Sequence, residues 1–368
     1  MTSGFSMKDQ LFNDEKVRYL AGLFAGDGFD ADRFHARVMS RLLELELKER
    51  MAWIAACLGE AVPGELPEVA PVILAALPPP LDPSLGDDDF GDFIFAPLGE
   101  WVAEIGIGHP DVALDVLEEL TQRFSMEWAI RPFLNRWPED VLARMELWAA
   151  HDSYHVRRLV SEGTRPRLPW GMAVGLALDD PLPLLDRLHG DRTRYVTRSV
   201  ANHLNDIAKK DPDLVLRRMA DWRALGVQDA DELRWMTTHA LRGLVKAGHP
   251  GAMKMLGYDP DADILVHVDI EGEARIGGAL EFDVEVSAAG DVPVLVDYII
   301  HFQRPGGKIS AKVHKLKQAV VRGGALKMRK RHKLKGDATT FKLVPGAHRL
   351  QIQVNGVVRV DQGFELLP

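Results

Sequence analysis

The chain has 368 residues, of which 46% are hydrophobic, so it is long enough for two ordinary domains with buried cores. Its formal net charge of -9 argues against a protein that coats nucleic acid indiscriminately, but it does not exclude a local basic groove. The single cysteine, Cys57, excludes an intrachain disulfide and a zinc cluster built on cysteines. The N-terminal residues lack the pattern of a secretory signal, and no apolar run is long enough to span a bilayer. We therefore expect a cytoplasmic protein without a membrane partner, with Met7 as a second candidate for its start.

The first part of the chain carries helical patterns. Residues 8–60 place apolar side chains at three- and four-residue spacing, as at Val17, Leu20 and Phe24. Residues 62–98 contain many prolines and an aspartate run at 87–89. These residues predict short helices joined by an acidic surface loop, because proline interrupts a long helix.

From Ile107 onward an X-Pro pair recurs, and each pair is followed by an amphipathic, helical pattern. The pairs begin at residues 109, 137, 180, 211 and 249. Proline suits the first turn of a helix, so each pair marks a helix start. Starts about 30 to 40 residues apart are typical of stacked helix pairs. The sequence therefore predicts a helical solenoid, the alternative being an irregular helical bundle.

Beyond residue 259 the pattern changes from helices to strands. Alternating or β-branched runs occur at 264–268, 280–286, 294–302, 341–344 and 350–354, with glycine-rich turns between them. About a hundred residues of this kind predict a small β-sandwich. We therefore expect two domains, an all-α solenoid at 1–259 and an all-β sandwich at 260–368.

Cationic side chains gather in the strand-rich part. Between Arg304 and Lys335 the chain carries twelve lysines and arginines and no acidic residue. Such a stretch attracts phosphates in a salt-dependent way. The alternative is a solvated edge strand that its lysines protect from aggregation.

The helical part has cationic positions of its own. Asp152 or Ser153 is predicted to cap a helix that runs to Glu162, with Gly163 as its left-handed terminator and with Arg157 and Arg158 projecting from its exposed side. Two further arginines, 165 and 167, lie in a proline-stiffened loop that ends at Trp170. Arginines held in place lose less entropy when they grip a phosphate, although ion pairs with nearby carboxylates would explain them equally.

One helix further, Arg194, Arg198 and Asn202 follow one another at four-residue steps. This spacing predicts a line of hydrogen-bond donors along one side of a helix. An ordinary polar helix surface would have the same spacing.

Glu127 is an acidic residue whose neighbours in the sequence predict a position at a groove. Ser125 is a candidate N-cap before it and Pro132 follows five residues later, which predicts a short helix, broken near Pro132, that holds Glu127 and Trp128 at a groove. The alternative is a first-turn glutamate that complements the helix dipole. Motifs for phosphate-cradling loops, dinucleotides, nucleophile elbows and zinc peptidases are absent, and we expect neither a metal nor a cofactor.

Four stretches of the chain resemble the AlkC/AlkD alkylpurine DNA glycosylases, and specifically the AlkC branch. The stretches are EWAIRPF at 127–133, VRRLVSEGTRPRLPW at 156–170, SVANHLNDI at 199–207, and HALR at 239–242 with KAGHPGA at 246–252. From the first to the last, they span about half of the predicted helical domain.

The resemblance implies a HEAT-like solenoid that holds bent duplex DNA and releases cationic methylated bases, chiefly 3-methyladenine and 3-methylcytosine, without turning the base into a pocket. Some members carry an immunoglobulin-like C-terminal domain, in agreement with the strand-rich part of this chain. Nothing in the sequence demands more than a monomer, which is the oligomeric state that we expect. Glu127 matches the catalytic carboxylate of the family and Trp170 an aromatic residue near the lesion, and we add Asp152 to the catalytic candidates. The predicted DNA contacts are Arg157, Arg158, Arg165, Arg167, Arg194, Arg198, Asn202, Lys327, Arg329, Lys330, Arg331 and Lys333.

Two other functions are compatible with the sequence. The first is a non-catalytic scaffold that binds bent or branched DNA, because helical solenoids are often binding surfaces and fold does not determine function. The second is a protein–protein adaptor whose acidic and basic parts meet different partners. Base release from methylated DNA separates the glycosylase from both alternatives.

Overall fold

The computed structural model describes residues 6–26, 28–85, 90–336 and 341–368. The chain divides into two compact units, Met1–Lys210 with Met219–Ala240, and Asp211–Arg218 with Leu241–Pro368. This division differs from the predicted boundary at 259/260, since the last two helices group with the strands. In the described ranges, no helix is both long and apolar enough to cross a membrane. The predicted acidic loop at 87–89 lies outside the described residues.

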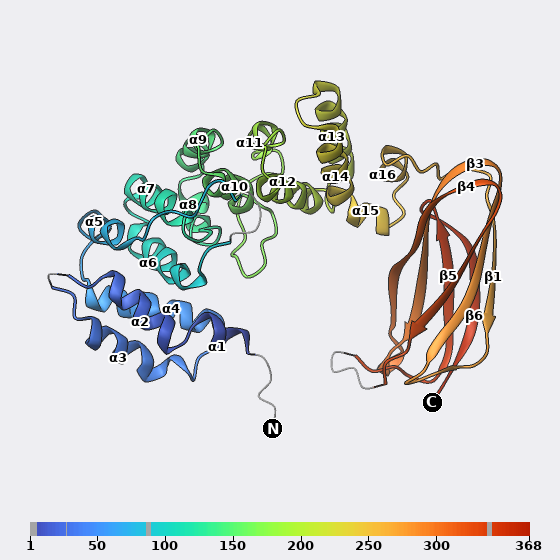
Figure 1. Ribbon diagram of the computed structural model, residues 1–368, viewed down its shortest axis with the longest axis horizontal. Helices are drawn as coiled ribbons and strands as arrows, with labels where there is room; N and C mark the ends of the chain where they lie inside the picture. The colour runs from blue at the N-terminus through green and yellow to red at the C-terminus, as the bar shows by residue number, and fades with distance from the viewer. Residues whose placement is uncertain (1–5, 27, 86–89, 337–340) are drawn as a thin grey trace. The chain divides into compact units, whose positions relative to one another are not determined.

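The first unit is helical (Figure 1). Its helices are α1 (Met7–Leu11), α2 (Asp14–Leu23), α3 (Ala31–Leu42), α4 (Leu47–Ala61), α5 (Leu66–Ala76), α6 (Ala96–Gly106), α7 (Pro110–Thr121), α8 (Arg131–Arg136), α9 (Pro138–Trp148), α10 (Tyr154–Gly163), α11 (Leu182–Leu188), α12 (Arg194–Ile207) and α14 (Ala230–Ala240), with a 3-10 turn at Phe93–Phe95. Helix α13 (Pro212–Leu225) begins in residues of the second unit, which also contains α15 (Arg242–Lys246) and α16 (Pro250–Met255).

The helices begin where side chains or prolines satisfy their first turns. The side chain of Asn13 accepts a hydrogen bond from the backbone of Lys16, and Glu46 forms a capping box with Glu49. Helices α7, α9, α13 and α16 begin at the proline of an X-Pro pair, and α11 begins directly after Pro181. The X-Pro prediction is therefore confirmed.

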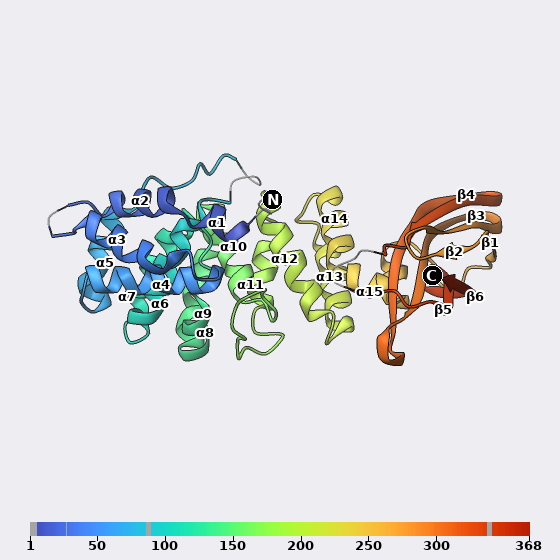
Figure 2. The same ribbon diagram turned by 90° about the horizontal axis from the view of Figure 1, so that it is seen from below.

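Helices α10, α12 and α14 form one layer of the solenoid. Helix α12 packs against both α10 and α14, while α9 and α11 pack against α10 from the other layer (Figures 1 and 2). The buried stripes of α10 and α12 include Leu159 and Val200, which are fully buried. The side of each helix that faces away from its buried stripe is turned toward solvent. This side carries the polar residues of the site.

Two local predictions are wrong. Pro71 lies inside α5 rather than interrupting it. Gly163 is the last residue of α10 and has no left-handed backbone. A Cβ at Gly163 would lie 2.7 Å from the side chain of Ile130, so its small size serves close packing instead.

The second unit is a β-sandwich with the helices α15 and α16. Its strands are β1 (Leu265–Glu271), β2 (Ala274–Arg275), β3 (Ala279–Gln303), β4 (Ile309–Lys333), β5 (Gly346–Val354) and β6 (Val357–Leu367). The strands pair in the order β1-β3-β5-β6-β2, and β4 pairs with β3. The first half of β3 pairs with β1 and its second half with β5, with a register shift between Ala288 and Asp291, so β3 and β4 extend through both layers (Figure 1).

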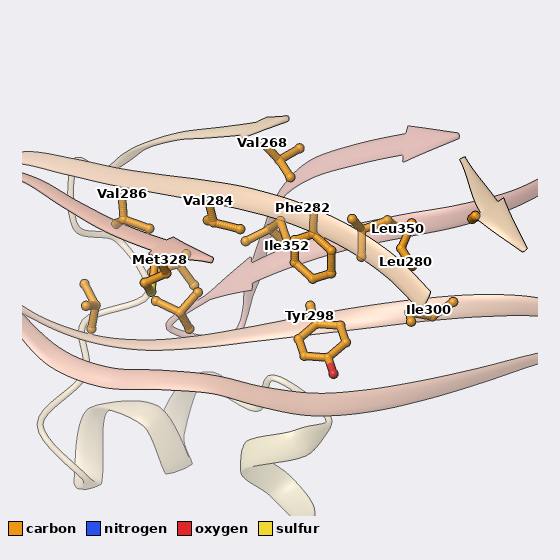
Figure 3. Packing of buried hydrophobic residues seen from close by; sticks show 14 of the residues in the cluster. Val268, Leu280, Phe282, Val284, Val286, Tyr298, Ile300, Met328, Leu350 and Ile352 are labelled. Atoms are coloured by element: carbon orange, nitrogen blue, oxygen red, sulfur yellow. The ribbon is translucent and has the colours of Figure 1, made fainter. Parts of the chain in front are cut away.

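The core between the layers is built from alternate residues of these strands. Phe282 and Tyr298 meet edge to face at 5.3 Å between ring centroids, among Val284, Ile300 and Ile352 (Figure 3). On the outer side of β3, Leu295 packs against α16 and the segment after it. The predicted strand at 341–344 is wrong, since its first residues have no strand pairing and β5 begins at Gly346.

Candidate active site

Glu127 lies in a turn at 127–130 that leads into α8. Its Oε2 accepts hydrogen bonds from Ser125 Oγ at 2.8 Å and from Arg158 Nη1 at 2.7 Å, and its side chain is 16% exposed. The prediction of an N-cap at Ser125 and a helix broken at Pro132 is wrong, because Pro132 sits in the first turn of α8. Glu127 is therefore held by side chains, with one edge of its carboxylate near solvent.

Arg158, on α10, is the main partner of Glu127. Its Nη2 lies 3.6 Å from Glu162 Oε2, and its Cζ lies 4.7 Å from the ring centroid of Tyr195. Burial disfavours its charge, but Glu127 and Glu162 outweigh burial and raise the pKa of Arg158. Arg158 is thus a permanent cation between two carboxylates.

A second ion network continues from Glu162 toward α12. Glu162 accepts hydrogen bonds from Arg165 Nη1 at 2.5 Å and from Ser199 Oγ at 2.6 Å, and Arg165 also donates to Asp206 at 2.7 Å. Burial opposes ionisation of Glu162, yet the charges of Arg158 and Arg165 lower its pKa. Arg165, a predicted DNA contact, is therefore committed to carboxylates of the protein.

Trp170 presents its indole beside this cluster. Its backbone is left-handed, with a φ of 65°, and the residue is 54% exposed. The rings of Trp128 and Trp170 lie 6.1 Å apart, and Trp128 Nε1 donates to the carbonyl of Pro169 at 3.1 Å. A left-handed backbone is strained for a bulky residue, and such strain is concentrated at functional sites.

Arg131 and Asn135 of α8 hold the loop that carries Trp170. Arg131 is fully buried and donates to the carbonyls of Arg165 at 3.0 Å and Met172 at 2.5 Å. Asn135 bonds the backbone of the same loop at residues 173 and 175, and Lys48 Nζ donates to the carbonyl of Trp170 at 2.9 Å. Five direct anchors therefore make the strained loop rigid.

Arg157 and Asp152 do not join the Glu127 cluster. The prediction that Arg157 projects from the exposed side of its helix is wrong, because Arg157 is buried and donates to Asp191 at 2.5 Å and to the carbonyls of residues 151 and 152. Asp152 is exposed, and Ser153, not Asp152, is the N-cap residue of α10. In the described residues no hydrogen bond or ion pair joins the Asp152 carboxylate to Glu127 or Arg158. Arg167 is exposed in the loop.

The predicted stripe on α12 lies on one half-exposed side of that helix. Arg194, Arg198 and Asn202 alternate with fully buried residues. Arg194 stacks at 3.9 Å over Trp235 of α14, and Asn202 Oδ1 lies 2.8 Å from His239 Nε2. The stripe therefore continues from α12 onto α14 as an ordered polar surface.

In the second unit, three of the predicted DNA contacts pair with acidic residues across the sheet. Lys327 lies 3.3 Å from Glu285, Arg329 pairs with Glu271, and Arg331 donates to Glu281 at 3.0 Å. Their charges are thus compensated, contrary to the expectation from the segment alone. Lys330 turns toward the ring of Tyr298 and Lys333 is exposed.

Sequence reasoning missed two residues of the site. Arg131 is a charged residue inside the apolar run AIRPF, which is a signal for a buried, bonded cation. Tyr195 is buried against Arg158, but no spacing distinguishes it from the core residues of α12. Its identification requires the packing of α10 on α12.

Comparisons with known proteins identify the family and the fold of the chain. Residues 266–368 match the family described as the C-terminal Ig-like domain of the uncharacterised protein YhaZ. The uncharacterized protein YhaZ of Bacillus subtilis strain 168 is 34% identical over 330 residues, which are 88% of each chain. The alkylpurine DNA glycosylase AlkC of Pseudomonas fluorescens, solved with DNA containing an abasic site analog, is 30% identical with a TM-score of 0.85, covering 99% of this chain and 100% of that one. The expected fold, a HEAT-like solenoid followed by an immunoglobulin-like sandwich, is confirmed, and the chain belongs to the AlkC branch of the AlkC/AlkD DNA glycosylase family.

Proposed function

We propose that this protein is a DNA N-glycosylase that excises cationic N3-alkylated bases, 3-methyladenine and 3-methylcytosine, from duplex DNA. The observation that carries the proposal is the carboxylate of Glu127. It is held at 2.7 Å by Arg158, remains partly exposed, and lies in the turn that also carries Trp128, which meets the half-exposed Trp170. This combination suits a cationic, aromatic substrate.

The chemistry follows from the charge of the lesion. An N3-methylated base carries a positive charge, so it leaves with the electron pair of the glycosidic bond without needing a proton. The sugar becomes oxocarbenium-like, and the negative charge of Glu127 stabilises it. Water then adds to C1′ and passes its proton to a base, a role that we assign to the Glu127 carboxylate.

Arg158 and Ser125 position this carboxylate before the reaction. Both donate to the same oxygen, Oε2, which leaves Oε1 for the sugar or the water. Positioning in advance matters, since an electrostatic catalyst then needs no reorganisation when charge develops. The aromatic pair Trp128 and Trp170 would attract the positive base by about 0.5 to 2 kcal/mol for each ring.

We propose that each unit contacts DNA by itself, the first through the polar side of α12 and α14 and the second through β4. Arg198 and Asn202 supply donors on α12, and Lys330 and Lys333 supply charge on β4. Phosphate contacts of this kind release counterions, so binding should weaken steeply with salt.

The test is release of free methylated bases from methylated duplex DNA by the wild-type protein and by Glu127→Gln. We expect 3-methyladenine or 3-methylcytosine from the wild type and at least a hundredfold slower single-turnover release by the variant, with DNA binding retained. Glu118→Gln, which changes a carboxylate paired with Arg144 and Trp148 instead, is the matched control. Equal rates for Glu127→Gln and the wild type would contradict the assignment of Glu127.

A non-catalytic DNA scaffold is the second candidate. It is favoured by one observation, that Glu127 already has an ion-pair partner and a hydroxyl donor, as a purely structural carboxylate would. It predicts tight binding to bent or branched DNA and no base release by any variant.

A further inference from the structure

The free edge of the β-domain carries an unusual group of basic side chains. Among the described strands β4 pairs only with β3, so it is an edge strand of both layers. Four of its residues lie directly opposite core residues of β3, in the pairs Tyr298 with His314, Ile300 with Lys312, Phe282 with Lys330, and Leu280 with His332. Opposite residues share a face of the sheet, so all four basic side chains point to the inner side of the sandwich edge. We call them the edge cluster.

Three members of the edge cluster, His314, Lys330 and His332, meet around the ring of Tyr298. Its hydroxyl points away from the labelled core residues in Figure 3 and lies 3.0 Å from His332 Nδ1. The ring of His314 stacks on Tyr298 at 4.9 Å and lies 4.9 Å from the ring of His332, and Lys330 Nζ lies 5.8 Å from the Tyr298 ring centroid. Two imidazoles and an ammonium group from two distant parts of one strand thus converge.

The charges around the cluster favour an anion as its ligand. Burial, His314, Lys330 and Lys312 lower the pKa of His332 to about 4. Burial, Lys312, Lys330 and Lys246 lower the pKa of His314. No acidic group is among these causes; burial first, and then the neighbouring cations, disfavour protonation of both histidines. The same cations would repel a metal ion and attract an anion.

Protection of the edge explains only part of this arrangement. Inward-pointing lysines are enough to prevent edge-to-edge pairing. They do not require two imidazoles against a buried tyrosine, and Nε2 of His314 is buried without a hydrogen-bond partner. An unsatisfied ring nitrogen beside two lysines indicates a polar ligand.

We propose that Lys312, His314, Lys330 and His332 form a binding site for a phosphodiester group of duplex DNA. The proposal rests on the proposed function in one respect, that DNA is the partner. Ammonium groups and imidazole N–H groups are donors that suit phosphate oxygens. A bound phosphodiester would also favour the protonated imidazoles, so binding would take up protons and strengthen as the pH falls.

The first experiment compares two double variants of the full chain on unmodified duplex DNA. Lys312→Gln/Lys330→Gln removes two charges from the edge cluster, and Lys308→Gln/Lys317→Gln removes two exposed charges from the same hairpin outside it. We expect the first variant to bind about tenfold more weakly and to lower the slope of log K against log salt by roughly 2, because each phosphate contact contributes about 0.9. Equal affinities and slopes of the two variants would overturn the proposal.

The second experiment follows the His332 and His314 ring protons by NMR, assigned with His332→Gln and His314→Gln. Unmodified duplex DNA should raise the pKa of His332 from about 4 by at least one unit. Inorganic phosphate is the second probe. If phosphate raises the pKa and the duplex does not, the site takes a free anion and the DNA assignment is wrong; if neither does, the cluster is not an anion site. Base release plays no part in either readout, so failure of the glycosylase proposal remains distinguishable.

Discussion

Arg158 and Glu127 form an ion pair between α10 and the turn before α8, with 2.7 Å between Nη1 and Oε2 and only 15% and 16% of the side chains exposed. The same arginine is within 3.6 Å of Glu162. Glu127 therefore shares its cation with Glu162, which also pairs with Arg165. The pair joins residues that are 31 positions apart, so it contributes to stability as well as to the geometry of the site.

The first prediction concerns this shared cation. Arg158→Gln should lower the free energy of unfolding by about 3 kcal/mol, because it leaves the poorly hydrated Glu127 without its ion-pair partner and removes one of the two cations beside Glu162. Arg187→Gln is the matched control, since Arg187 pairs with Glu146 at 3.5 Å on the exposed surface and such pairs contribute about 1 kcal/mol or less. Urea denaturation followed by circular dichroism measures both. Equal losses would show that Arg158 has no special role in stability.

The second prediction concerns the strained backbone of Trp170. At a φ of 65° glycine is unstrained and alanine is not, so Trp170→Gly should be more stable than Trp170→Ala by about 1 kcal/mol. Both variants lack the indole, so both should lose base release to the same extent. Thermal unfolding and single-turnover release measure the two effects separately. If the alanine variant proves at least as stable as the glycine variant, the strain does not exist in solution.

Periodicity predicted the parts of the site that lie within one helix. Arg194, Arg198 and Asn202 occupy one side of α12, as four-residue steps require. The X-Pro pairs likewise marked helix starts, because the preference of proline for a first turn is local. Features that are determined within a single helix, such as its first residue and the residues on one of its sides, could therefore be predicted from the sequence.

Interactions between elements were not accessible in this way. Arg157 and Arg158 are neighbours with the same chemistry, yet Arg157 is buried against Asp191 and Arg158 reaches Glu127. The difference arises from which helices flank α10. The compensation of Arg329 by Glu271 likewise depends on the pairing of β1, β3 and β4, which composition does not reveal.

The third prediction concerns acid stability and His203. This residue is fully buried, and its Nδ1 lies 3.0 Å from the carbonyl of Ser161. Burial lowers its pKa from 6.5 to about 4. As the pH falls, His203 therefore takes up a proton in the unfolded chain before it does so in the folded chain. Its contribution to the free energy of unfolding is fully present above pH 6.5, and about 3 kcal/mol is lost as the pH falls toward 4.

His203→Gln tests this pH dependence, since glutamine keeps an amide donor for the Ser161 carbonyl and does not titrate. Between pH 7 and pH 4 the variant should lose less unfolding free energy than the wild type. His267→Gln, which changes an exposed histidine, is the control and should follow the wild type. Parallel pH profiles of His203→Gln and the wild type would contradict the buried, neutral histidine.

The fourth prediction concerns the contact between Gly248, which follows α15, and Gly356, in the turn between β5 and β6. A Cβ on Gly248 would lie 2.4 Å from the carbonyl oxygen of Gly356, and both glycines have a left-handed backbone. Gly257 has the same kind of backbone, with a φ of 85°, but nothing lies within 4 Å of the position of its Cβ. Gly257→Ala should therefore cost only about 1 kcal/mol of strain, whereas Gly248→Ala should cost clearly more, because two backbones must separate. Urea denaturation of the full chain measures both variants, and equal losses would show that α15 does not pack against this turn in solution.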